Sequence, residues 1–385
     1  MAKIKETSVA AIFQNNVARF ADRPCTAYKS GDAFADLSWK QMDEKIRNTA
    51  YYLLDQGIKK GDKVALFSPN RYEWFVADMA ILSIGAVNVP IYATNSPDEA
   101  LYILENSDSK MCFCGTEDHL DRILKVRKKL PKLAQLIIFE EYSKKKQGVL
   151  TLEKAMEKGA DYKSKSTFEK RLKAIKGDDL ATLIYTSGTT GNPKGVMLTH
   201  SNFVSNVKQI LADFSDYVTD SDVFLSFLPL SHSLERTSGY YLAMAVGAKI
   251  AYAQDFSTIQ EDLALVRPSC MISVPRLYEK IHSGLLARVA DAPGLKKALF
   301  NWSMKVAAKN LPYVCQDKKP GGLLGKKVDL ADKLIWSKLK DALGFDRLRL
   351  AVSGGGPLAV SDAEFFLGMG IVILEGYGLD RKSVV

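Results

Sequence analysis

Short apolar segments alternate with amphipathic helical patterns along most of this chain. Strand-like segments at 64–67, 87–91, 111–114 and 135–139 are separated by helical patterns, the clearest at 72–83. A chain that alternates in this way can bury its strands only if helices cover both faces of a parallel sheet. We therefore expect an α/β fold.

The alternation is interrupted once and then resumes. Residues 140–179 are polar and rich in lysine. Further strands are expected after this excursion, at 180–185, 223–227, 249–253, 270–274, 348–352 and 371–374. We expect two mainly parallel, helix-covered subdomains: residues 1–179, which include the lysine-rich excursion at 140–179, and residues 180–385.

Composition excludes several protein classes. Apolar residues make up 47% and charged residues 25% of the 385 residues, as in packed globular proteins. No apolar run approaches the 18 residues that a membrane span needs, and residues 1–20 have no long apolar core of an export signal. The five cysteines lack a disulfide framework or zinc spacing. We expect a cytoplasmic protein with reduced thiols.

The chain is basic, with a formal charge of +9. Its densest lysine runs, at 125–132, 144–146 and 318–327, contain almost no aromatic residues, so no nucleic-acid partner is expected. Solvated helix faces and loops explain such runs best. Peripheral contact with an anionic membrane and attraction to cofactor phosphates remain as alternatives, and the sequence does not set an oligomeric state.

A loop rich in hydroxyls and glycines follows the strand expected at 180–185 and precedes a helix that begins near Ser201. Glycines allow the backbone N–H groups to turn toward an anion, hydroxyls add donors, and a lysine adds positive charge. A Walker A loop is excluded, because Pro193 stands five residues after Gly188, where that pattern requires Gly-Lys-Ser/Thr. The residues expected to hold a triphosphate are Thr186, Ser187, Gly188, Thr189, Thr190, Gly191 and Lys194.

The segment 185–196 resembles the phosphate-loop signature of the adenylate-forming superfamily, which includes acyl-CoA synthetases, peptide-synthetase adenylation domains and luciferases. Four further motifs follow in the order of that superfamily, at 229–236, 274–280, 353–358 and 375–379. The Ser-His-x-x-Glu-Arg form of the first and the sequence of the second are similar to bacterial long-chain fatty acid CoA ligases. The resemblance implies the acetyl-CoA synthetase-like N-terminal domain.

The resemblance also implies the chemistry. A fatty acid carboxylate attacks the α-phosphorus of ATP, pyrophosphate leaves, and coenzyme A takes the acyl group in full-length relatives, with Mg²⁺ on the phosphates. Lys194, Thr189 and His232 are the implied catalytic residues. A flat aromatic face and close backbone approach suit an adenine base. The implied adenine-side residues are Gly354, Gly355, Gly356, Pro357, Glu375, Gly376, Tyr377 and Gly378.

The motif at 229–236 carries the implied acyl pocket. In the resembling enzymes the position of His232 lies beside the substrate carboxylate, and Arg236 or the pair Tyr240 and Tyr241 is expected to border the acyl tunnel. Two plainer alternatives stay open: His232 as a structural histidine, and Glu235 with Arg236 as an ordinary ion pair.

The chain departs from the superfamily pattern after Leu379. The pattern continues with Thr-Glu, where the Glu holds Mg²⁺, but this sequence has Asp380 and Arg381. No metal ligand is therefore assigned. We expect a truncated or frameshifted chain that lacks most of the barrel subdomain and the C-terminal domain and is weakly active or incomplete. The alternatives are a non-catalytic module that binds ATP or fatty acid, and a fatty-acyl-AMP ligase.

Overall fold

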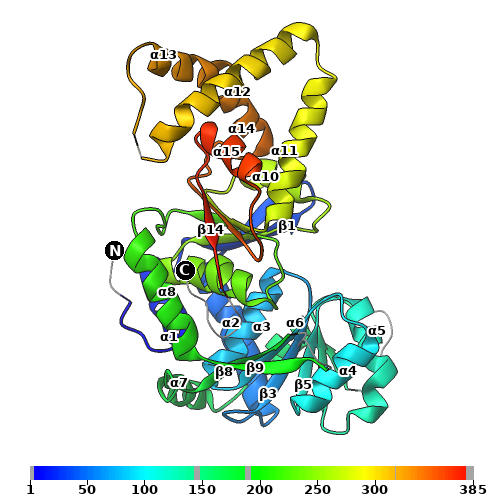
Figure 1. The fold of residues 1–385 in the computed structure, drawn as a ribbon. Coiled ribbons are helices and arrows are strands. Elements are labelled where there is room, and N and C mark those ends of the chain that lie inside the picture. The colour runs from blue at the N-terminus through cyan, green and yellow to red at the C-terminus, as the bar shows by residue number, and fades with distance from the viewer. Residues whose placement is uncertain (1–3, 143–147, 187–191, 317, 379–385) are drawn as a thin grey trace.

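The computed structural model describes residues 4–142, 148–186, 192–316 and 318–378. The strands in these ranges form two seven-stranded sheets (Figure 1). In spatial order, sheet A consists of β14 (Ile373–Gly376), β13 (Leu350–Gly354), β12 (Cys270–Ser273), β10 (Val223–Ser226), β11 (Lys249–Tyr252), β1 (Pro24–Ser30) and β2 (Ala33–Ser38). Sheet B consists of β7 (Val149–Thr151), β6 (Gln135–Ile138), β5 (Met111–Cys114), β3 (Lys63–Phe67), β4 (Val87–Ile91), β8 (Leu180–Thr186) and β9 (Lys194–Thr199). Only β1–β2 and β8–β9 pair antiparallel. The expected α/β class is confirmed.

Helices connect and cover these strands. In the first half they are α1 (Val9–Phe20), α2 (Trp39–Asp55), α3 (Tyr72–Ser83), α4 (Pro97–Asn106), α5 (Glu117–Val126), η1 (Arg127–Lys129), α6 (Leu152–Ala160) and α7 (Lys165–Lys173). In the second half they are α8 (His200–Phe214), η2 (Glu235–Tyr241), α9 (Leu242–Val246), α10 (Ile259–Val266), α11 (Pro275–Ala290), α12 (Gly294–Val314), α13 (Gly322–Ala331), η3 (Asp332–Trp336), α14 (Ser337–Leu343) and α15 (Val360–Gly368). Across the described residues, no helix combines the length and apolar character needed to cross a membrane.

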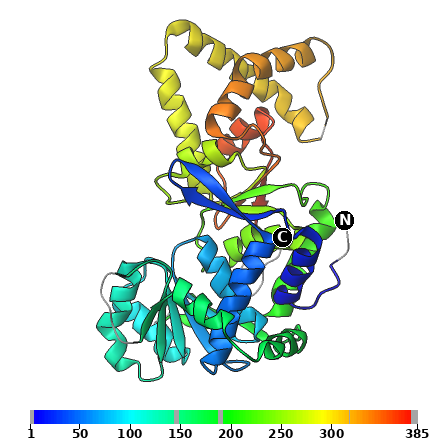
Figure 2. The ribbon, with the colours of Figure 1, turned by 180° about the vertical axis from the view of Figure 1, so that it is seen from behind.

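The layers follow from the alternation of side chains along each strand. In β3, Val64 and Leu66 enter a core between the two sheets, whereas Ala65 and Phe67 enter a second core under the outer helices of sheet B. A third core lies under the outer helices of sheet A. Nearly every residue of α3 is buried, because α3 belongs to the layer of helices that both sheets share. Figure 2 shows the two sheets and this middle layer from behind.

The sheets do not divide the chain at the boundary expected at residue 179. The early hairpin β1–β2 joins sheet A by pairing with β11, in the register Ala27↔Ala251. The hairpin β8–β9, at 180–199, instead completes sheet B. The sequence did not predict β1 and β2, because only three of their thirteen residues are buried and their sequence lacks a continuous apolar run.

A buried ion pair ties the middle layer together. Arg236 in η2 and Asp78 in α3 have fully buried side chains, and their Nη2 and Oδ1 atoms lie 2.5 Å apart. The Arg236 guanidinium also donates to Thr182 of β8 and to the hydroxyl of Tyr241, which itself donates to Asp78. One cation thus connects η2, α3 and sheet B through charged and hydroxyl partners, and the rings of Trp74 and Phe203 also pack against it.

Glu235, the residue before Arg236, is buried without such a partner. Within the described part of the chain, neither carboxylate oxygen of Glu235 has a hydrogen-bond partner. Burial raises the pKa of Glu235 to about 8, although the nearby Ser226 hydroxyl lowers it somewhat. Gly239 is required here, because a Cβ at that residue would lie 2.5 Å from Glu235 Oε1. Glu235 is therefore mostly protonated at neutral pH.

Replacing Arg236 with Met should lower the free energy of unfolding by about 3–5 kcal/mol, because Asp78 would stay buried without its cation. Urea denaturation measures this change. Lys132→Met is the matched control, because it breaks the Lys132–Asp108 pair, whose side chains are 67% and 61% exposed, and should cost less than about 1 kcal/mol. Equal losses in the two variants would contradict the assigned role of the buried pair.

Protonation of Glu235 should make stability depend on pH. The folded protein keeps this proton up to about pH 8, whereas the free side chain releases it near pH 4.5. The stabilisation is therefore complete below about pH 4 and is lost as pH rises toward 8, by about 1.4 kcal/mol per pH unit. Subtracting the free energy of unfolding of Glu235→Gln from that of the parent, between pH 5 and 8, isolates this slope. A difference that does not vary with pH would show that Glu235 is ionised in the folded state.

Candidate functional site

The expected phosphate loop lies at the tip of the β8–β9 hairpin. Thr186 ends β8, and Lys194 begins β9 directly opposite it in the ladder. Lys194 is exposed. The intervening residues Ser187, Gly188, Thr189, Thr190 and Gly191 lie outside the described residues. The structure thus fixes both ends of the loop at the carboxyl end of a sheet B strand, where parallel sheets bind ligands.

An open cleft of about 710 Å³ adjoins the two ends of this loop. Thr186, Asn192 and Pro193 line one part of it, and Tyr102 from α4 lines another. The Tyr102 hydroxyl donates to the Pro193 carbonyl over 3.0 Å, which ties the loop to α4. Burial raises the pKa of the neighbouring Tyr185 to about 12, so that this tyrosine stays protonated and donates to Asn106. We call this hollow the outer cleft.

His232 lies where the outer cleft meets a second cavity. It is half-buried, between β10 and η2. Its Nδ1 accepts a hydrogen bond from the Leu234 amide over 3.2 Å, and its own amide donates to the Pro229 carbonyl over 2.9 Å. Because Nδ1 is an acceptor, the neutral ring carries its proton on Nε2. The ring is thus held in one tautomer by its own loop.

The second cavity, which we call the inner cavity, measures about 240 Å³. Apolar side chains of α8, α9 and the sheet A strands line most of its wall, among them Ile210, Phe214, Leu242 and Ile272, whereas η2 contributes hydroxyl side chains. The motifs expected around residues 232 and 375 meet here, although the sequence separates them by more than a hundred residues. The expected site residues that line the cavity are His232, Gly355, Glu375, Gly376, Tyr377 and Gly378.

The glycine turn after β13 forms one rim of the inner cavity. Gly354 is packed tightly, since a Cβ there would lie 2.9 Å from Leu234 Cδ2. Gly355 has a φ of +80°, which favours glycine. Glu375 Oε1 accepts a hydrogen bond from the Leu358 amide over 2.9 Å and so holds the turn against β14. Gly356 and Pro357 are exposed on the same turn but do not line the cavity.

Tyr377 follows β14 and lies next to the glycine turn, because Gly354 and Gly376 are partners in the parallel ladder. Its side chain is among the exposed large apolar ones, with 73% of its surface accessible. An aromatic ring in such a position offers a flat face for stacking. The backbone beside it, at Gly376 and Gly378, carries no side chain that would keep a flat ligand away.

Arg236, Tyr240 and Tyr241 do not border either hollow, which corrects the expected tunnel lining. All three side chains are fully buried in the middle layer. Arg236 is committed to Asp78, and the rings of Tyr240 and Tyr241 pack on each other with centroids 4.7 Å apart. The alternative that pairs Glu235 with Arg236 is wrong, because Arg236 pairs with Asp78 and the Glu235 carboxyl has no hydrogen-bond partner among the described residues.

Sequence reasoning missed the contribution of α8 and of the elements around the outer cleft. Asn206, Ile210 and Phe214 recur every four residues and so lie on one face of α8, toward the inner cavity. The four-residue spacing can be read from the sequence, but it does not indicate which part of the protein this face of α8 contacts. Asp98 and Glu99 of α4 line the outer cleft, and Glu99 also caps its own helix through the Ser96 amide.

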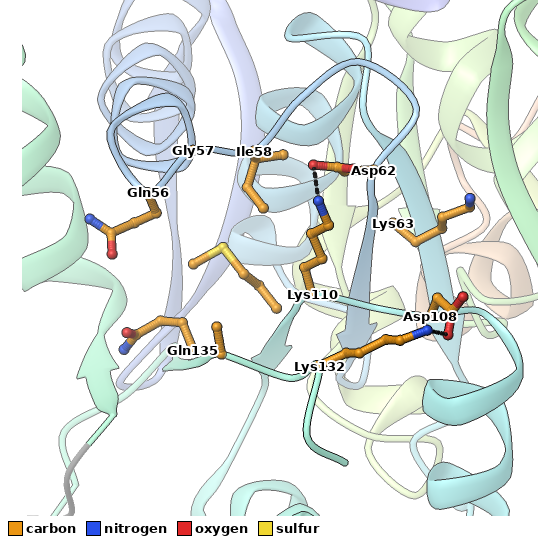
Figure 3. A pocket seen from close by; sticks show the side chains of 11 residues that line it. Gln56, Gly57, Ile58, Asp62, Lys63, Asp108, Lys110, Lys132 and Gln135 are labelled. Atoms are coloured by element: carbon orange, nitrogen blue, oxygen red, sulfur yellow. Dashed lines mark hydrogen bonds and ion pairs between the residues drawn. The ribbon is translucent and has the colours of Figure 1, made fainter.

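A further pocket of about 570 Å³ opens at the other end of sheet B, at the amino ends of β3, β5 and β6 (Figure 3). Lys110 pairs with Asp62, and Lys132 pairs with Asp108, each over 2.8 Å. None of the expected site residues lies there. Because Lys110 and Lys132 are engaged and the pocket opens at the amino ends of the strands, we assign no ligand to it.

Comparisons with known proteins find relatives of this chain. A protein of Mycobacterium bovis named long-chain-fatty-acid–CoA ligase is 34% identical over 353 residues, which are 91% of this chain and 56% of the relative. A human protein of that name is 32% identical over 383 residues, 98% of this chain and 56% of the relative. The chain spans about half the length of the curated relatives it matches.

The fold has solved counterparts. The adenylation domain of a carboxylic acid reductase from Segniliparus rugosus, in complex with AMP and a co-purified carboxylic acid, superposes with a TM-score of 0.71 at 20% identity, covering 96% of this chain and 60% of that one. The family model described as AMP-binding enzyme matches residues 13–380. With nearly the whole chain matched, this protein belongs to the AMP-binding enzyme family, the adenylate-forming superfamily.

Proposed function

We propose that this chain provides the site at which a long-chain fatty acid CoA ligase joins a fatty acid to AMP. The observation that carries the proposal is the position of His232, which borders both the apolar inner cavity and the outer cleft beside the phosphate loop. A reaction between an acyl carboxylate and a nucleotide phosphate needs a place where the acyl site and the phosphate site adjoin. The similarity to proteins named long-chain-fatty-acid–CoA ligase supports the choice of acid.

The proposed roles follow from the geometry. The acyl chain occupies the apolar inner cavity, and adenine stacks on Tyr377 beside Gly376. The phosphates lie in the outer cleft beside the two ends of the loop, and Lys194 neutralises the departing pyrophosphate. The resemblance gives Thr189 the same role, but this residue lies outside the described residues. A carboxylate oxygen attacks the α-phosphorus, and the bond from that phosphorus to the bridging oxygen breaks. His232 donates from Nε2 to the carboxylate and orients it.

Two further groups belong to the proposal. Coenzyme A would take the acyl group from the adenylate as a thioester. Mg²⁺ would screen charge on the phosphates, but the described residues contain no cluster of three or more His, Cys, Asp or Glu side chains that could hold a metal ion. Asp380 lies outside the described residues. The proposal therefore assigns no residue and no step to Mg²⁺.

A cytoplasmic location is also proposed. Four of the five cysteines are buried, and all five are free thiols. Burial raises the pKa of Cys25 and Cys270 above the usual thiol value and keeps them protonated. Free thiols of this kind are typical of reducing compartments.

Binding of an acyl-adenylate mimic tests the site on this chain without requiring turnover. A palmitoyl sulfamoyl adenosine should bind more tightly than either AMP or palmitate in calorimetry, because it fills the adenine rim and the inner cavity together. Binding no tighter than AMP would overturn the proposal. Binding of the mimic without fatty-acid-dependent exchange of labelled pyrophosphate into ATP would favour a non-catalytic module, and adenylate formation without thioester formation would favour a fatty-acyl-AMP ligase.

Lys194→Ala should weaken ATP binding by about 10- to 100-fold, because it removes a charged donor to the phosphates. The affinity for the adenylate mimic should change far less, since the mimic lacks the β- and γ-phosphates. Calorimetry with both ligands separates the two effects. Lys125→Ala, at an exposed lysine of α5, is the matched control. Equal ATP affinity in the two variants would remove Lys194 from the site.

A further inference from the structure

The helices between β12 and β13 form a lobe of their own, at the end of the molecule farthest from sheet B (Figures 1 and 2). Residues 294–344 of this lobe contain eleven lysines and four aspartates, and no arginine or glutamate. Their formal charge is +7, against +9 for the whole chain. Most of the net charge of the protein is therefore carried by one protruding lobe.

Three leucines of this lobe are exposed on one helical face. The segments α13, η3 and α14 follow one another without a break from Gly322 to Leu343. Leu323 is 71% exposed, Leu330 47% and Leu334 38%. Leu323 and Leu330 lie seven residues apart in α13 and so share one row along the helix. Leu334 follows about one turn later, in the π-helical segment η3. The opposite face, with Ala331 and Trp336, is buried in the core under sheet A.

Lysines flank this row. Lys326 and Lys327 follow Leu323 by three and four residues, and Lys333 follows Leu330 by three, so that they lie beside the same leucines. All three are exposed, and none forms an ion pair with a carboxylate of the described residues. Nearby Asp332 is already engaged by Lys340 at 2.9 Å. The face thus combines exposed apolar side chains with three exposed lysines, whose charge the exposed Asp329 of α13 offsets only in part.

We propose that the face formed by Leu323, Leu330, Leu334, Lys326, Lys327 and Lys333 docks on an anionic lipid bilayer. Leucines in a row can enter the boundary between headgroups and acyl chains, while lysine stems lie along it and their ammonium groups contact lipid phosphates. A second copy of this chain is a poor occupant, because two lobes of charge +7 would repel each other. A nucleic acid would find no exposed aromatic ring on this face.

Co-sedimentation of the full chain with phospholipid vesicles tests the charge requirement. Binding is expected to phosphatidylcholine vesicles that contain phosphatidylglycerol, to weaken as salt is added, and to be absent with phosphatidylcholine alone. The triple variant Lys326→Gln, Lys327→Gln, Lys333→Gln should bind about 100-fold more weakly, since each lysine contributes roughly a factor of five near an anionic surface. The triple variant Lys125→Gln, Lys128→Gln, Lys129→Gln removes the same charge from another exposed run and should bind like the parent.

A second pair of variants tests the apolar requirement. Leu323→Ser should weaken vesicle binding several-fold, whereas Leu265→Ser, at an exposed leucine of α10, should not. Circular dichroism and thermal melting verify that both variants fold. The proposal is overturned if the chain does not bind the anionic vesicles, or if the variants and their controls lose binding equally. Self-association in sedimentation equilibrium that Leu323→Ser abolishes, without vesicle binding, would assign the face to a second copy.

Discussion

The arrangement depends on one constraint: two mainly parallel sheets, each with two apolar faces, share a single layer of helices. A helix at the centre of such a layer has no solvent-exposed side and must be apolar almost all round, as α3 is. A polar group there is costly in a low dielectric unless it is paired or neutral. Arg236 and Asp78 meet this requirement in full. The same helix η2 that holds Arg236 continues from the loop of His232, so the packing of the layer sets the position of the candidate catalytic group.

Most single elements of the fold could be predicted from the sequence. The helix at 72–83 and the strands at 87–91 and 111–114 have the limits expected from the sequence pattern. Pairing between distant strands could not be predicted, because it depends on tertiary packing. β9 was also missed, since its six residues follow the glycine-rich loop directly and only one of them is buried.

Some residues of the candidate site could also be predicted from the sequence, and others could not. Residues in compact motifs, such as Gly355 and Tyr377, could be named because glycine and aromatic residues carry specific backbone and stacking properties. The error over Arg236, Tyr240 and Tyr241 has a physical cause. A helix beside a pocket has one face toward the ligand and another toward the core, and η2 has a π-helical turn that shifts which residues occupy each face. Without the partner Asp78, which is 158 residues distant, the sequence offers no way to choose between the faces.

The early hairpin β1–β2 has a consequence for the order in which the two sheets form during synthesis. All seven strands of sheet B lie between residues 63 and 199, so that sheet can assemble as soon as this stretch has left the ribosome. β1 is made earlier than any of them, yet its partner β11 ends only at Tyr252. One edge of the hairpin therefore stays unpaired while the ribosome adds more than two hundred residues. Contacts of such long sequence separation are slow to form and leave an open strand edge exposed to other chains. Sheet A is thus the later and more vulnerable half of the nascent protein.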